Sequence, residues 1–169
     1  MTTAETVQSP PYAVPPESAF EENGYAGFLP APDLKRLADR LIPNHELPIA
    51  GATNVIYLWR AEGGKHKGQP VYAKIQAPSG LLEHFSRADF VLWVAADHLR
   101  ARKASARFVE AVLHHELLHV TEDEKGNLVL QGHGFEGFLR EVELYADVVE
   151  ELQAIVHTVR QMSLDEAVS

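Results

Sequence analysis

The residues with the clearest chemical potential lie in the run AVLHHELLHV, at positions 111–120. Within it, His115 and His119 are four residues apart, and Glu116 directly follows the first of them. On a helix, residues at i and i+4 lie on the same face, so the two imidazoles can bind one Zn²⁺. A carboxylate in the position of Glu116 can take a proton from a water molecule beside such an ion. The pattern therefore predicts a hydrolytic zinc site, with two histidine ligands and a glutamate as the general base.

A catalytic zinc ion commonly has three protein ligands, so the chain must supply one more. We expect His133, because a turn at 125–127 and a short strand at 128–131 can bring the chain back toward His119. The glycines on both sides of His133 allow a sharp approach at the start of the next helix. The alternative ligands are carboxylates from the same downstream stretch, namely Glu136, Glu141 and Glu143.

The elements that position the motif follow from local patterns. The stretch Phe108–Val120 has no glycine or proline, and we expect a helix from about Ser105 to Val120. The other expected elements are a helix at Leu34–Ile42, strands at Val55–Arg60, Val71–Gln76, Asp89–Ala95 and Leu128–Gln131, and a last helix from near His133 to about Met162. A Gly-Gly, Lys and His segment between the first two strands indicates a hairpin loop. This order is typical of an α+β fold with a small antiparallel sheet.

The sheet also indicates how a substrate could bind. An extended peptide could add as a strand beside an exposed edge, supplied by Asp89–Ala95 or Leu128–Gln131. We therefore expect a protein or peptide as the partner of the site.

Three further polar residues are secondary candidates for roles at the site. Arg140 would share a helix face with His133 and could stabilise an oxyanion, but an ion pair with Glu136 explains it more simply. Tyr145 is a weaker alternative donor. His114 is expected at the surface or beside a ligand, because it lies about 100° around the helix from the first histidine of the motif.

The composition excludes other kinds of site and partner. The chain of 169 residues contains no cysteine, so disulfides and thiolate metal sites are impossible. Its net charge of −9 argues against broad electrostatic binding to nucleic acid. The N-terminus lacks the features of a secretory signal, and no apolar run approaches the roughly 20 residues of a membrane span. We expect a cytoplasmic protein without nucleic-acid or membrane partners.

Proline and polar residues dominate the start of the chain. We interpret residues 1–31 as a flexible arm, because such a segment has little apolar surface to bury. The expected organisation is this arm, one compact domain at 32–162 and a short tail at 163–169.

The motif and the stretch that follows it resemble the phage metallopeptidase family, which is itself similar to SprT-like zinc peptidases. The resemblance lies in HHELLHV, the following Lys-Gly-Asn turn and LVLQGHGFEGFLREVELY, and it covers about residues 32–148. It implies a minimal zincin fold, a zinc cofactor, the metal ligands His115, His119 and His133, and Glu116 as the catalytic residue. It also implies a location in the host cytoplasm or the virion.

The predicted function is that of a zinc-dependent metallopeptidase, cutting within its substrate by means of a metal-activated water. The alternative is a catalytically silent zinc-binding module of the same fold that binds a protein partner. Glu116 favours the enzyme, because a binding module needs no general base. A third possibility, an SprT-type protease acting on DNA-bound proteins, needs a DNA-binding surface that the charge of −9 argues against.

Overall fold

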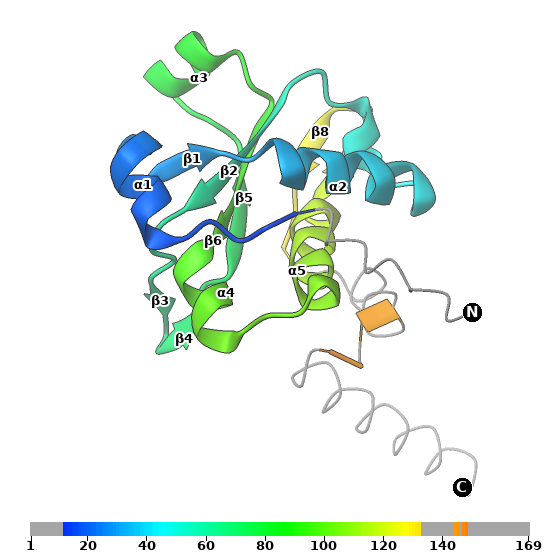
Figure 1. The fold of residues 1–169 in the computed structure, drawn as a ribbon. Helices are drawn as coiled ribbons and strands as arrows, with labels where there is room; N and C mark the ends of the chain where they lie inside the picture. Colours follow the sequence, from blue (N-terminus) through cyan, green and yellow to red (C-terminus); the bar gives the residue numbers. More distant parts are fainter. Residues whose placement is uncertain (1–11, 133–143, 146, 149–169) are drawn as a thin grey trace, which may run out of the picture.

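A computed structural model describes residues 12–132, 144–145 and 147–148 of the chain (Figure 1). The helices are α1 (Glu17–Asn23), α2 (Pro32–Asn44), α3 (Leu81–Ser86), α4 (Ala96–Arg102) and α5 (Ala106–Leu118), with a 3₁₀ turn η1 (Pro48–Gly51). The strands are β1 (Phe28–Pro30), β2 (Val55–Arg60), β3 (Lys65–His66), β4 (Gln69–Pro70), β5 (Ala73–Gln76), β6 (Phe90–Ala95), β7 (Val120–Glu122) and β8 (Leu128–Leu130). The expected α+β class is confirmed.

The main sheet has four strands in the order β1-β2-β6-β5. β1 pairs with β2, and β5 with β6, in antiparallel fashion, but β2 and β6 run parallel. The prediction of an antiparallel sheet is therefore wrong for its central pair. Parallel neighbours need a long crossover connection, and residues 61–89 supply one.

The expected hairpin between the first two predicted strands, Val55–Arg60 and Val71–Gln76, is also wrong. β5 pairs with β6 instead of β2, and the Gly-Gly, Lys and His segment forms its own small hairpin from β3 and β4. All six residues of β6 are buried, so this strand is most stable in the interior of the sheet with a neighbour on each side. Burial of β6 thus separates β2 from β5.

Helix α5 begins where the sequence predicts it. The Ser105 hydroxyl accepts a hydrogen bond from the Phe108 backbone N–H at 3.1 Å, which satisfies one of the free donors of the first turn. The apolar face of α5 is buried through Phe108, Val109, Ala111, Leu113 and Leu117. This face packs against α2 and β5, so the helix that carries the motif is held on one face of the sheet (Figure 1).

Helix α2 completes this layer. Its buried face consists of Leu34, Leu37, Ala38 and Leu41, at the spacing expected for a half-buried helix. The Asp33 carboxylate accepts a hydrogen bond from the Trp59 indole N–H at 3.1 Å, which fixes the start of α2 on β2.

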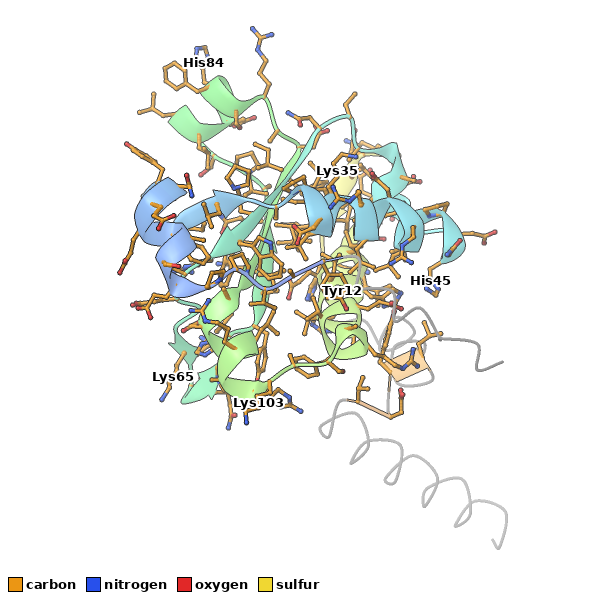
Figure 2. The ribbon with its side chains drawn as sticks, viewed as in Figure 1. Tyr12, Lys35, His45, Lys65, His84 and Lys103 are labelled. Carbon is orange, nitrogen blue, oxygen red and sulfur yellow. The ribbon has the colours of Figure 1, made fainter. Side chains whose placement is uncertain are left out.

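The N-terminal segment differs from the expected flexible arm. Within residues 12–31, α1 forms a helix and β1 adds a strand to the main sheet. Tyr12 and Phe20 are buried in the core, and the Tyr12 hydroxyl donates to the Ala106 carbonyl of α5 (Figure 2). These two buried aromatic side chains therefore outweigh the prolines that suggested disorder.

Two features of the surface complete the description. Helix α3 projects from the rest of the fold, with His84 on it and with Leu81 and Phe85 exposed (Figure 2). Among the described residues, no helix has the length and apolar character needed to cross a membrane.

Candidate metal centre

The donor atoms of His115, Glu116 and His119 come together at the C-terminal end of α5. One ligand atom from each residue lies within 4.8 Å of the others. The two imidazole rings have centroids 5.0 Å apart and stand nearly perpendicular, at 84°. Within residues 12–132 and the described positions near 145, this is the one group of side chains with such metal-binding geometry. The helix therefore brings the three residues together, as their i, i+4 spacing predicts.

The orientation of His119 fits a metal ligand. Its Nδ1 atom lies 2.9 Å from the Gln131 backbone carbonyl oxygen. A carbonyl can only accept, so Nδ1 carries the proton and a neutral ring keeps its lone pair on Nε2. Metal-binding histidines commonly donate their second ring N–H to a carbonyl or carboxylate in this way. The donor set of the motif thus fits a divalent metal ion.

The β7–β8 hairpin brings Gln131 to this position. Its turn is closed by the Asp123 carboxylate, which accepts from the backbone N–H groups of Lys125 and Asn127 and from the Asn127 side chain. These hydrogen bonds, led by the one from the Asn127 side chain, lower the pKa of Asp123. The Gln131 backbone N–H then donates to the His119 carbonyl at 2.8 Å. A short local turn therefore orients a histidine of the motif.

The carboxylate of Glu116 is held between α5 and the sheet. Its Oε2 atom accepts a hydrogen bond from the Ile75 backbone N–H at 2.8 Å. Ile75 belongs to β5, the edge strand of the sheet. The Ala95 N–H donates to the Tyr72 carbonyl, so the backbone N–H and C=O groups of residues 72, 74 and 76 point toward β6. The backbone groups of residues 73 and 75 therefore point outward, away from the sheet. The glutamate thus lies at an outer edge of the sheet.

This arrangement corrects the expected substrate edge. Asp89–Ala95 was expected to offer an exposed edge, but β6 lies inside the sheet with β2 on one side and β5 on the other. The edge beside Glu116 belongs to β5. Leu128–Gln131 contains β8, which pairs with β7 in a separate hairpin, and its role as an edge stays a prediction.

The residues expected to complete the ligand set follow the β7–β8 hairpin in the sequence. His133 and its alternatives lie outside the described residues, as does Arg140; the alternatives are Glu136, Glu141 and Glu143.

Two aromatic residues have positions that the sequence did not indicate. His114 is fully buried, with its ring edge-on to His45 at 4.7 Å and near Tyr145 at 5.2 Å. The expected surface position is therefore wrong for His114. The Tyr145 hydroxyl donates to the Glu110 carboxylate at 3.2 Å, which gives it a partner away from the motif. The i, i+4 spacing of Glu110 and His114 is the one feature of the sequence that could have indicated that these residues share a face of α5.

An α+β domain with a His-Glu-His donor set on one helix, beside the edge strand of its sheet, defines the general class of metal-dependent peptidases. Comparison with protein families gives the particular group: the chain belongs to the family described as "Putative phage metallopeptidase", whose model matches residues 26–160. This confirms the resemblance drawn from the motif, and the match includes β1. Neither the curated proteins nor the solved structures gave a match.

Proposed function

We propose that this chain is a zinc-dependent endopeptidase. The observation that carries the proposal is the convergence of His115, Glu116 and His119 at one end of α5, with His119 oriented by a backbone carbonyl. Nitrogen and oxygen donors with no cysteine in the chain suit Zn²⁺, which binds histidine nitrogens at about 2.0–2.1 Å. The family supports a metallopeptidase, and a protein or peptide is accordingly the proposed substrate.

His115, His119 and His133 are the proposed ligands. The Gln131 backbone is bound to His119 through two hydrogen bonds, one in each direction. His133 follows two residues later, and two residues of extended chain span at most about 7 Å. This short covalent connection to Gln131 supports His133 as a ligand over Glu136 and Glu143, which follow Gln131 at a greater distance along the chain.

Glu116 is the proposed general base. When bound, zinc supplies Lewis acidity, which polarises a peptide carbonyl and makes water nucleophilic near neutral pH. Glu116 accepts the proton of the attacking water and later delivers it to the leaving amine. The Ile75 N–H fixes one oxygen of this carboxylate, so the base is oriented before substrate arrives.

The outer edge of β5 is the proposed docking edge for an extended peptide. Ala73 and Ile75 present their backbone groups away from β6, and of these the Ile75 N–H is bonded to Glu116, so a peptide would pair with the others. A peptide that pairs with this edge would gain backbone hydrogen bonds independent of its side chains. Its backbone would also pass next to Glu116.

The experiment uses the purified full chain, a disordered protein or peptide library as substrate, and metal analysis by mass spectrometry. We expect about one zinc per chain and cleavage that a chelator abolishes and zinc restores. Glu116→Gln should keep its zinc and lose about 10²–10⁴-fold in rate. No zinc uptake at micromolar zinc would refute the metal site. Equal cleavage by wild type and Glu116→Gln would refute the base, and zinc-loaded wild type that cleaves nothing would favour a binding module.

A further inference from the structure

The face of α5 that points away from the motif carries a second group of polar contacts. Arg107, Glu110 and His114 lie at i, i+3 and i+7, so they form one stripe along the helix. All three contact the short segment at residues 144–148, which is distant in sequence. We call this set of contacts the rear anchor.

Tyr145 is the centre of the rear anchor. It is only 1% exposed, and its hydroxyl donates to the Glu110 carboxylate at 3.2 Å. Its ring lies 5.2 Å from that of His114, and the Arg107 guanidinium lies 5.4 Å from its centroid. A buried aromatic ring with a satisfied hydroxyl is a strong point of attachment between two segments.

Arg107 adds a polar attachment on both sides of Tyr145. Its Nε and a terminal nitrogen donate to the two oxygens of Asp147, at 2.7 and 3.1 Å. The same terminal nitrogen also donates to the Leu144 carbonyl. The two hydrogen bonds to Asp147 give a paired geometry that lysine could not reproduce.

The two ends of the intervening chain are thus attached to opposite ends of α5. Gln131 is bound to His119 at the C-terminal end, and Leu144–Asp147 is bound to Arg107 in the first turn. Arg107 and His119 are twelve positions apart along the helix, a rise of about 18 Å. The chain that connects Gln131 to Leu144 is therefore joined to α5 at both of its ends.

We infer that Arg107, Glu110 and Tyr145 are positioning residues for the metal centre, acting through this second attachment. The inference rests on the proposed function, because His133 lies in the chain between the attachments. A chain fixed at both ends has fewer conformations to lose when one of its side chains binds a metal. The rear anchor should therefore strengthen zinc binding without touching the ion.

The first measurement is hydrogen exchange of the metal-free full chain, followed in peptides that cover residues 144–148. Arg107→Gln should speed exchange there, because it removes the contacts to Asp147 and Leu144. Lys35→Gln is the matched control: Lys35 on α2 (Figure 2) forms an ion pair with Asp39, also 2.7 Å long and similarly exposed. Unchanged exchange in Arg107→Gln would overturn the anchor itself, whether or not zinc binds.

The second measurement is zinc affinity by competition with a chromogenic chelator. Arg107→Gln and Tyr145→Phe should each weaken binding by about three- to tenfold, and Lys35→Gln should leave it unchanged. Glu110→Leu should behave like Tyr145→Phe, whereas Glu110→Gln should restore most of the affinity, because its amide oxygen still accepts from the Tyr145 hydroxyl.

The two measurements separate the possible failures. Faster exchange with unchanged zinc affinity would overturn the positioning role and leave the proposed peptidase intact. Wild type that binds no zinc would overturn both the proposed function and the positioning role, while the exchange data would still report on the anchor. Faster exchange together with weaker zinc binding in the same variants is the expected result.

Discussion

The imidazole of His119 and the backbone carbonyl of Gln131 are joined by a 2.9 Å hydrogen bond through Nδ1, so Nε2 is the nitrogen that we propose binds the metal. This bond connects the last residue of the motif to the hairpin that follows it. His119 also receives the Gln131 N–H at its own carbonyl. The ring is therefore oriented by the chain immediately upstream of the proposed third ligand.

We predict that His119→Ala loses zinc and peptidase activity together, because it removes a ligand. This differs from Glu116→Gln, which should lose activity alone. Zinc content and cleavage rate measured on the same preparations check the prediction. His84→Ala, an exposed histidine on α3, is the control and should change neither quantity. Full zinc content in His119→Ala would remove this residue from the ligand set.

The third ligand can be assigned by comparing three alanine variants. We predict that His133→Ala lowers zinc affinity by about 10²-fold or more, whereas Glu136→Ala and Glu143→Ala keep near-normal affinity. The reason is the short covalent distance between Gln131 and position 133. Visible spectra of the cobalt-substituted proteins would report the change in coordination directly. Loss of affinity in a glutamate variant alone would move the protein to the Glu-ligated class.

Much of the site could be predicted because its signals are local. The H-E-x-x-H spacing, the serine that begins α5 and the absence of helix breakers in Phe108–Val120 all act within one helix, and the structure agrees with them. The strands β2 and β6 were found for the same reason, since β-branched and aromatic residues are concentrated in them.

Strand pairing and burial were harder to predict because they depend on distant residues. Nothing in the sequence near β2 indicates that β6 will be its parallel neighbour. Because β6 lies between β2 and β5, β5 is the edge strand beside Glu116. The burial of His114 likewise depends on contacts with His45 and Tyr145, one of which precedes α5 in the sequence and the other of which follows it. Local patterns contain neither kind of information.

The turn that closes the β7–β8 hairpin gives a prediction about pH and metal affinity. Asp123→Ala should weaken zinc binding by roughly two- to fivefold, because it loosens the hairpin that delivers Gln131 to His119. The adjacent exposed Glu124→Ala is the control.

The pKa of Asp123 is lower in the folded than in the unfolded protein. Its contribution to stability is therefore complete above an unfolded pKa of about 3.9 and is lost as pH falls through the folded value.

Acid titration of unfolding would check this sign. Wild type should lose more stability than Asp123→Ala as the pH is lowered below about 4, so the two unfolding midpoints should converge in acid. Parallel curves would show that Asp123 titrates alike in the folded and unfolded states, contrary to the hydrogen bonds it accepts.

The N-terminal segment provides a test of the fold. Phe20 on α1 is 8% exposed, whereas Tyr25, just after that helix, is 88% exposed. We predict that Phe20→Ala lowers the free energy of unfolding by about 3–5 kcal/mol, because it removes a buried aromatic side chain from the core. Tyr25→Ala should change it by less than about 0.5 kcal/mol. Urea unfolding of the metal-free proteins separates the two without any contribution from zinc. Equal, small effects from both substitutions would mean that residues 12–31 behave as the flexible arm that their composition suggests, whereas a large loss confined to Phe20→Ala would establish α1 as part of the domain.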